Sequence, residues 1–297
     1  MMNNLVIISS QFQLINSIEL IKKEFKNQDF NAVVFIHNNN HLFQIESLAK
    51  KNNIKILFKV RYRKILQYFF LILKSLFVQK FDKIILGNCH DNLMQFMLKT
   101  LRYNHLYFVD DGNILETLNI KPKMNNRFLP VKYFTMFNVD NNKYYDFIYN
   151  DYNHIKKSLN IEQVKDNTKI LFIGQPLVEQ GLIEKEIFIN IFNKIIKKLD
   201  RKLLYVLHPR ELENKFLELK NISTIRLDKG IESYLISSNM LPSKVIGFYS
   251  TALNSISKIF SSDEIDIRFV DLSRHTKIIH GQSEYKYLKE NLNEIII

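Results

Sequence analysis

The sequence predicts an α/β protein of two domains, each built on a parallel sheet covered by helices. Short apolar runs alternate with segments of helical period over residues 5–112 and again over residues 169–272. Between them, residues 121–167 are rich in aromatic residues and Asn and show no sustained apolar period. The 297 residues, 46% of them hydrophobic, suffice for two ordinary cores. We therefore predict Rossmann-like domains over 1–155 and 156–297, joined by a connection that serves as a hinge.

The first domain is predicted to contain five strands separated by helices. The strands cover residues 5–9, 32–37, 54–58, 83–87 and 105–109, and helices follow from Gln11, His41 and Asp91. No GxGxxG pattern follows the first strand, so the usual dinucleotide fingerprint is absent. Residues 61–80 form the most apolar segment, which is too short and too interrupted by Lys74 to span a bilayer. It is either a buried helix or an amphipathic helix on an anionic membrane surface.

The second domain repeats the same alternation. Its strands are predicted over residues 169–173, 203–207, 223–227, 244–246 and 267–272, and its helices over 184–199, from Glu211, over 231–238 and from Thr251. The tail from 282 to 297 is expected to be a helix that packs back across the hinge.

Charge and cysteine content narrow the class of protein. The formal net charge of +12 calls for an anionic partner. Lys and Arg are spread over nearly every helix, without a long basic run or an aromatic RNA-binding signature, so nucleic acid is not the expected partner. The single cysteine, Cys89, excludes internal disulfides and suits a reducing cytoplasm. The first residues lack a basic start followed by a long apolar run, so we interpret them as a strand and not as a signal peptide.

Polar side chains follow the predicted strands where ligands bind in open α/β sheets, at the carboxyl ends. HLYFVDDG ends in Asp110, Asp111 and Gly112, and LLYVLHPR ends in His208 and Pro209. These ends supply carboxylates in one domain and an imidazole in the other.

A pair of hydroxyl residues, Ser250 and Thr251, follows a third strand and opens an amphipathic helix. Such a helix N-terminus offers unpaired N–H groups and a partial positive charge to a phosphate. The sequence therefore combines an acid, a base and a phosphate cradle at strand ends.

The DDG element, the HP element and the hydroxyl pair, in that order, resemble the bacterial sialyltransferases. With GQP at residues 174–176 and the length of the chain, the sequence is most similar to glycosyltransferase family 52, the lipooligosaccharide sialyltransferases, with the capsular polysialyltransferases as relatives. Each motif is short, but the resemblance covers most of the chain.

The resemblance implies a glycosyltransferase-B fold and inversion at the anomeric carbon, without a metal or other cofactor. The implied donor is CMP-sialic acid, or the CMP form of a related nonulosonic acid, bound by the second domain. The first domain would hold the acceptor, a terminal sugar of a bacterial surface glycan such as lipooligosaccharide or capsule. The expected location is the cytoplasm or the inner face of the cell membrane. An anionic membrane surface and a second copy of the chain are the further partners considered, and nucleic acid is not.

Roles follow from the matched motifs. His208, beside Pro209, would protonate or hydrogen-bond the departing phosphate, which Ser250 and Thr251 would hold. Glu232 stands where related enzymes carry an acid that binds the donor ribose. Gly174 and Gln175 complete the predicted donor-binding set.

The general base is left open among three carboxylates. We place Asp111 first, Glu179 in GQPLVEQG second and Glu184 third, because a base must take a proton from the acceptor hydroxyl. Each motif also has a purely structural interpretation: an N-cap aspartate for DDG, a capped core histidine for His208 and a helix N-terminal glutamate for Glu232. Competing functions are a glycosyltransferase-B enzyme for another nucleotide sugar, and a non-catalytic basic module that binds nucleic acid or anionic membrane.

Overall fold

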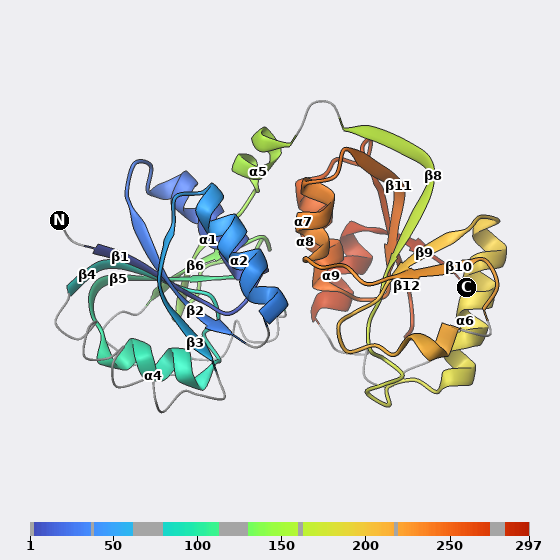
Figure 1. Cartoon of the computed structure of the whole chain (residues 1–297), viewed down its shortest axis with the longest axis horizontal. Coiled ribbons are helices and arrows are strands. Elements are labelled where there is room, and N and C mark those ends of the chain that lie inside the picture. The colour runs from blue at the N-terminus through green and yellow to red at the C-terminus, as the bar shows by residue number, and fades with distance from the viewer. Residues whose placement is uncertain are drawn as a thin grey trace. The chain divides into compact units, whose positions relative to one another are not determined.

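The computed structural model describes residues 3–36, 39–61, 80–112, 130–159, 163–216, 219–273 and 283–296. The chain divides into two compact units, Met1–Ile155 and Lys156–Ile297, and each is described by itself (Figure 1). The apolar segment over 61–80 lies almost wholly outside the described residues.

The first unit is a seven-stranded parallel sheet in the order β3-β2-β1-β4-β5-β6-β7. The chain therefore reverses its direction of travel across the sheet between β1 and β4. Helices α1 and α2 lie together on one side of the sheet and α4 lies on the other (Figure 1). The elements are β1 (Asn3–Ile8), α1 (Gln11–Glu24), β2 (Phe30–Ile36), α2 (Asn39–Lys51), β3 (Lys55–Arg61), β4 (Lys80–Leu86), α4 (Asn92–Thr100), β5 (Arg102–Val109), β6 (Val131–Thr135), β7 (Tyr145–Tyr149) and α5 (Asn153–Ser158).

The prediction that residues 121–167 only connect the domains was wrong. This stretch contributes β6 and β7, which extend the first sheet beyond β5, and the short helix α5. Their apolar side chains are largely aromatic and pack on one another: the rings of Tyr133 and Tyr145 meet edge to face with centroids 5.6 Å apart. Each strand is only 5 residues long, and polar residues separate the two strands. The apolar run that marks the other strands is therefore missing here.

The second unit is a six-stranded parallel sheet in the order β10-β9-β8-β11-β12-β13, so its chain reverses between β8 and β11. Helix α6 lies on one side of this sheet, and α7, α8 and α9 lie on the other (Figure 1). The elements are β8 (Val164–Ile173), α6 (Lys185–Leu199), β9 (Leu203–Val206), η3 (Glu213–Phe216), β10 (Ile222–Ile225), α7 (Ile231–Ile236), β11 (Met240–Gly247), α8 (Thr251–Ile259), β12 (Asp266–Val270), α9 (Ser283–Asn291) and β13 (Asn293–Ile295).

Two further expectations for the second unit need correction. Where a helix was expected from Glu211, the described residues form the 3-10 turn η3. The Glu211 side chain accepts hydrogen bonds from His208 and Tyr205 and belongs to the preceding loop. The tail does form a helix, α9, but it then continues as β13, which pairs with β12 and is an edge strand of the second sheet. The tail thus packs within its own unit.

The second core is dominated by aromatic rings that hold the central strands. Phe172 of β8 is fully buried and its ring contacts those of Phe192, Tyr205 and Phe248, with centroids 4.8, 5.4 and 4.9 Å away. Burying rings of this size is the main source of stability for such a sheet. It fixes the strands whose carboxyl ends carry the predicted motifs.

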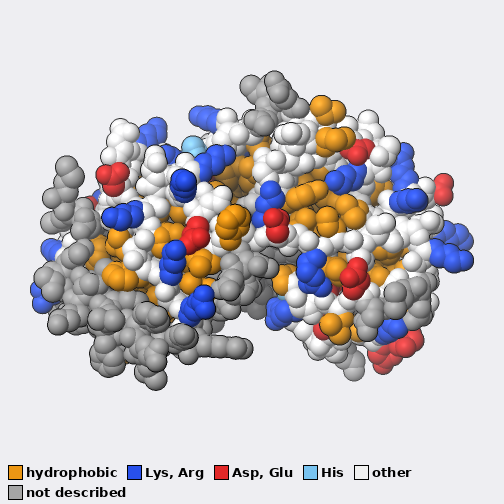
Figure 2. Space-filling view, viewed as in Figure 1, with side chains coloured by type: hydrophobic (Ala, Val, Ile, Leu, Met, Phe, Trp, Pro, Cys, Tyr) orange, Lys and Arg blue, Asp and Glu red, His pale blue; other side chains and the backbone are white. Residues whose placement is uncertain are grey.

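Lys and Arg side chains are scattered over the face of the molecule shown in Figure 2 and do not gather into one patch. Among the helices that the structure describes, none has the length and apolar character needed to cross a membrane.

Candidate active site

In the first unit, Asp111 follows β5, the strand beside β4. Its partners come from the first turn of α1, which follows β1, and from the loop after β4, so they flank the point where the chain reverses across the sheet. The side-chain amides of Gln13 and Asn88 each donate a hydrogen bond to the Asp111 carboxylate, one to each oxygen. Gln13 lies in a predicted helix and Asn88 in a predicted strand-end loop, but the sequence analysis identified neither of them as a partner of Asp111.

The two amides are held so that their NH₂ groups face Asp111. The Gln13 Oε1 accepts the Ser9 backbone N–H at 2.6 Å. The Asn88 Oδ1 accepts the backbone N–H groups of His90 and Asp91 at 2.8 and 3.0 Å. Because each amide oxygen is already engaged, each NH₂ group is directed at the carboxylate, as expected for a preorganised site.

Gly87 makes room for this arrangement. A Cβ at Gly87 would collide with the side chain of Gln13, including its amide group. The residue that follows β4 must therefore be glycine if Gln13 is to reach Asp111.

The two aspartates of DDG have different surroundings. Asp110 is fully buried, and its Oδ2 accepts the Met136 backbone N–H at 2.7 Å. Asp111 is partly exposed. Burial raises the pKa of each carboxyl to about 7; for Asp111 the Gln13 hydrogen bond acts in the opposite direction and the charge of Asp91 adds to the rise. Asp111 thus titrates near neutral pH and is accessible, which is what a general base requires.

In the second unit, His208 lies in the turn that follows β9. His208 is partly exposed, so it is not fully enclosed in the core. Its Nδ1 accepts the Arg210 backbone N–H at 3.1 Å. In the neutral imidazole the proton is therefore on Nε2, the nitrogen that can donate to a phosphate oxygen.

Glu211 organises this turn, and the sequence analysis missed it. It is buried, and its carboxylate accepts the His208 backbone N–H at 2.6 Å and the Tyr205 hydroxyl at 2.7 Å. The guanidinium of Arg226 donates to the carbonyl oxygens of His208 and Pro209, both at 3.2 Å, and to that of Glu211 at 2.9 Å. The turn over residues 208–211, which we call the HPRE turn, is thus held by the Glu211 carboxylate and by the Arg226 guanidinium. These contacts define the position of the His208 imidazole.

The GQP loop after β8 joins the turns on either side of it. A Cβ at Gly174 would collide with the Glu211 carboxylate and would lie 2.6 Å from the Val206 carbonyl oxygen, so only glycine fits. The Gln175 side chain pairs with the backbone of Tyr249: its Nε2 donates to the carbonyl oxygen at 2.6 Å and its Oε1 accepts the N–H at 3.2 Å. These contacts tie the β8, β9 and β11 loops together.

The hydroxyl pair opens α8 as predicted. Ser250 is the N-cap residue, and its hydroxyl accepts the Ala252 N–H at 3.3 Å, while Thr251 is the first helical residue. Glu232, in the first turn of α7, is buried against α8 and accepts the Ser255 hydroxyl at 2.7 Å. Burial raises the pKa of Glu232. Its ribose-binding role stays a prediction.

The rival bases belong to the second unit. The Glu179 carboxylate accepts the Leu212 backbone N–H at 2.8 Å and so bridges the loops after β8 and β9. Glu184 occupies the N-cap position of α6. The contact to Leu212 gives Glu179 a place in the scaffold, whereas the Glu184 side chain makes no capping hydrogen bond to α6. Of the three carboxylates, Asp111 has the hydrogen-bonded, partly buried surroundings that suit a base.

The predicted residues of the second unit, apart from Glu232, therefore meet at one sheet edge, and Asp111 heads a separate cluster in the first unit. Among the residues that the structure describes, no three His, Cys, Asp or Glu side chains cluster in a way that could hold a metal ion.

Comparison with solved structures supports the fold. The chain is similar to the UDP-GlcNAc 2-epimerase of Methanocaldococcus jannaschii in complex with UDP-GlcNAc and UDP, with a TM-score of 0.58 and 14% identity over 100% of this chain and 89% of that one. It is also similar to S. aureus MnaA with UDP, with a TM-score of 0.53 and 14% identity over 97% and 87%. The E. coli heptosyltransferase WaaC with ADP matches with a TM-score of 0.49 and 8% identity over 90% and 86%. The matches with TM-scores above 0.5 confirm the predicted glycosyltransferase-B type of fold.

A search of the curated proteins finds no significant match. The family model "Alpha-2,8-polysialyltransferase (POLYST)" matches residues 114–266, which is more than half of the chain. That stretch includes GQP, the HPRE turn and the hydroxyl pair, and begins two residues after DDG. The match confirms the resemblance to bacterial sialyltransferases that the motifs suggested. The chain therefore belongs to the alpha-2,8-polysialyltransferase family, which is a family of glycosyltransferases.

Proposed function

We propose that this protein transfers sialic acid, or a related nonulosonic acid, from its CMP donor to a terminal sugar of a bacterial surface glycan such as lipooligosaccharide or capsule. The observation that carries the proposal is the family match over residues 114–266, which contain the HPRE turn and the hydroxyl pair. The first unit is assigned to the acceptor and the second to the donor.

The leaving group of such a donor is CMP, whose phosphate gains negative charge as the glycosidic bond breaks. We assign His208 Nε2 to donate a hydrogen bond or proton to that phosphate. The N-terminus of α8 offers the phosphate its backbone N–H groups and the Ser250 and Thr251 hydroxyls. These donors together would stabilise the departing charge without a metal ion.

Buried polar atoms without a partner support a ligand near the start of α8. Within the part of the second unit that the structure describes, two groups of buried atoms have no hydrogen-bonding partner: the hydroxyl of Tyr249, the residue before Ser250, and both side-chain amide atoms of Asn254, one turn into the helix. Leaving such groups unsatisfied costs about 1–3 kcal/mol each. A bound nucleotide would give hydrogen-bonding partners to this region of the unit.

On the acceptor side, Asp111 is assigned as the general base. It would take the proton from the attacking hydroxyl while the bond between C2 of the acidic sugar and the CMP phosphate oxygen breaks. Attack and departure on opposite faces of the sugar invert the anomeric carbon. One unit then supplies the base and the other the donors for the leaving group.

The nucleotide preference tests the donor. CMP and CDP are expected to raise the melting temperature more than UMP, GMP or AMP, because a ligand that binds only the native state stabilises it more the more tightly it binds. The shift should be lost in Ser250→Ala and kept in Ser257→Ala, which removes another α8 hydroxyl, one bonded to the Asn254 carbonyl oxygen. EDTA should leave transfer from CMP-sialic acid unchanged.

The competing functions give other results. Preferential stabilisation by a uridine or guanosine nucleotide would indicate a glycosyltransferase for another sugar donor. Salt-sensitive binding to duplex or vesicles with no turnover would indicate a basic binding module. A strict need for added Mg²⁺ or Mn²⁺ would contradict the metal-free mechanism.

The proposal extends to location, with the enzyme acting peripherally at the inner face of the cell membrane. The net charge of +12 favours an anionic surface, and its attraction is screened over roughly 10 Å at 0.1 M salt. Flotation should therefore recover the protein with phosphatidylglycerol vesicles at low salt, less of it at high salt, and little with phosphatidylcholine vesicles. Absence of binding to the anionic vesicles at low salt would overturn this part of the proposal.

A further inference from the structure

Helix α1 carries an unusual set of buried polar side chains. Gln13, Asn16, Ser17 and Glu19 are each at most 2% exposed. Buried polar groups reduce stability unless they are hydrogen-bonded, so each of them needs a specific partner. Gln13 binds the Asp111 carboxylate, and Ser17 donates to the Gln13 carbonyl oxygen within the helix at 2.7 Å. The side chains of Asn16 and Glu19 bind other segments of the first unit.

Asn16 joins the DDG element to the segment with which the first unit ends. Its Nδ2 donates to the Asp110 carbonyl oxygen at 3.1 Å. Its Oδ1 accepts the side-chain amide of Asn150 at 3.1 Å and the hydroxyl of Tyr152 at 2.9 Å. The Asn150 Oδ1 in turn accepts the Tyr152 N–H at 3.0 Å, which directs the Asn150 NH₂ group at Asn16.

Together with two further bonds, these contacts complete a ring of hydrogen bonds that passes through Asp110. The Asn150 backbone N–H donates to the Thr135 carbonyl oxygen at 2.6 Å. Met136 follows Thr135, and its backbone N–H donates to the Asp110 carboxylate. Asp110 is therefore held through its side chain by the end of β6 and through its carbonyl by Asn16. The main chain that bears the Asp111 carboxylate has little freedom.

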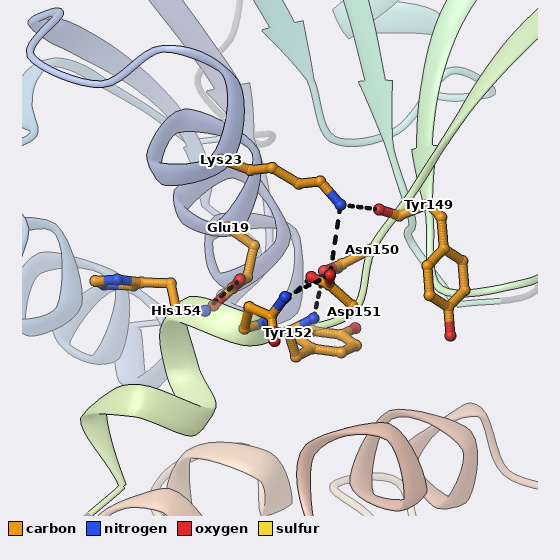
Figure 3. Close-up of polar contacts among 8 residues, drawn as sticks. Glu19, Lys23, Tyr149, Asn150, Asp151, Tyr152 and His154 are labelled. Atoms are coloured by element: carbon orange, nitrogen blue, oxygen red, sulfur yellow. Dashed lines mark hydrogen bonds and ion pairs between the residues drawn. The ribbon is translucent and has the colours of Figure 1, made fainter.

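The segment from Tyr149 to Ile155 is fastened to α1 along its length (Figure 3). Lys23 donates to the Tyr149 carbonyl oxygen at 2.8 Å and lies 3.6 Å from the Asp151 carboxylate. The buried Glu19 carboxylate accepts the backbone N–H groups of His154 and Ile155 at 3.1 and 2.6 Å, at the start of α5. One helix thus holds the end of the first unit with one part of its surface and the aspartates with another.

Tyr152 adopts a backbone conformation that is unfavourable for its residue type. Its φ is +52°, a left-handed conformation that a bulky residue rarely adopts, and its side chain is fully buried. Such strain costs of order 1–3 kcal/mol and persists where surrounding contacts impose it, often at functional sites. The hydrogen bond to Asn16 is one of these contacts.

We propose that Asn16 is a positioning residue for the reaction: it fixes the Asp110–Asp111 main chain to the Asn150–Tyr152 segment and so sets the place of the Asp111 carboxylate. This inference rests on the proposed function, in which Asp111 is the base. Removing Asn16 leaves the Asp110 carbonyl oxygen, the Asn150 amide and the Tyr152 hydroxyl without this partner. The carboxylate then moves relative to Gln13 and Asn88, and displacements of about 1 Å can cost about 100-fold in rate.

The titration of Asp111 reports this displacement. The Gln13 hydrogen bond lowers the pKa of Asp111, so weakening it raises that pKa further. Among the described residues, the titratable groups that interact with Asp111 electrostatically are Asp110, Asp91, Cys89 and Tyr133. Burial raises the pKa of Cys89 to about 12 and that of Tyr133 well above its usual value, so these two stay neutral through the range concerned.

Two variants test the inference. Asn16→Ala is expected to lower kcat for transfer from CMP-sialic acid by about 10- to 100-fold, to leave the donor KM unchanged and to move the acid limb of the pH profile to higher pH. Tyr152→Phe removes one donor to Asn16 and keeps the ring, so it should change kcat and the limb in the same direction but only severalfold. Ser17→Ala is the matched control, because it removes a buried hydrogen bond from the same helix without touching Asp110 or Asn150.

Carbon-13 NMR titration of the Asp111 carboxyl provides a readout that does not depend on the reaction. It should show a higher pKa in Asn16→Ala and an unchanged one in Ser17→Ala. If Asn16→Ala and Tyr152→Phe are folded and keep the wild-type kcat, pH limb and titration, the positioning role is wrong. Equal losses of kcat in all three variants would show that Asn16 only helps to stabilise α1 and does not position Asp111. A wild-type protein that does not use CMP-sialic acid would defeat the proposed function, and the titration would still decide the role of Asn16.

Discussion

Asp111→Asn is expected to lower kcat for sialyl transfer by about 10²–10⁴, the usual contribution of a positioned general base. Asn keeps the size of the side chain but cannot accept a proton from the acceptor hydroxyl. Donor binding, assigned to the second unit, should be unaffected, so CMP should still stabilise the variant. Steady-state kinetics on CMP-sialic acid with a sialylated acceptor, together with a CMP thermal shift, measure both. Wild-type kcat in a folded Asp111→Asn protein would remove Asp111 from the mechanism and direct attention to Glu179.

The pH profile gives the same assignment a second test. The pKa of Asp111 is raised to about 7, and only the ionised form is a base, so kcat/KM should rise with pH through about 7. Asp110 titrates in the same range, and the limb therefore reports the pair of carboxyls. Asp91→Asn should move the limb to lower pH, because the Asp91 charge contributes to the raised pKa. Its N-cap bonds to Leu93 and Met94 use one oxygen, which Asn retains.

His208→Ala is expected to lower kcat by about 10²–10⁴ with a much smaller change in donor affinity. The imidazole is partly exposed in a turn fixed by Glu211 and Arg226, so its removal should not unfold the protein. Donors whose phosphate leaving group carries an electron-withdrawing substituent need less help from an acid. They should partly restore the rate of this variant.

Glu211→Gln separates chemistry from support of the turn. The Glu211 carboxylate accepts hydrogen bonds from the His208 backbone N–H and the Tyr205 hydroxyl, one on each oxygen, whereas Gln has a single acceptor oxygen and so keeps only one of these two bonds in its present direction. This variant should lose thermal stability and should not be rescued by the better leaving group. A His208→Ala protein that is folded, binds CMP and turns over near the wild-type rate would remove the HPRE turn from the mechanism.

Short apolar runs were enough to predict most of the fold. Runs such as those of β1, β4, β8 and β11 are buried on both faces of parallel sheets, so their apolar character is continuous and visible in the sequence. The two sheets and the helices between them follow from that pattern. The strands β6 and β7 could not be predicted in this way. They are stabilised by aromatic side chains such as Tyr133 and Tyr145, which come into contact only once the strands have paired in the sheet.

The motif residues were found for a similar local reason. DDG, HP, GQP and the Ser250–Thr251 pair each follow a strand directly, and the carboxyl edge of a parallel sheet is where ligands bind. Their order along the chain was sufficient to suggest the family that the family model then showed.

The partners of those residues were decided only by the tertiary structure. Gln13 lies 98 residues from Asp111 and Asn16 lies 134 from Asn150, and no local pattern links residues so far apart. Glu211 is only three residues from His208, yet its role depends on a space that exists because Gly174, on another loop, has no side chain. The sequence by itself therefore determined which groups stand at the strand ends. Folding decided which amides, carbonyl oxygens and glycines orient them, because hydrogen bonds and steric fit depend on distances between loops that meet only in the folded sheet.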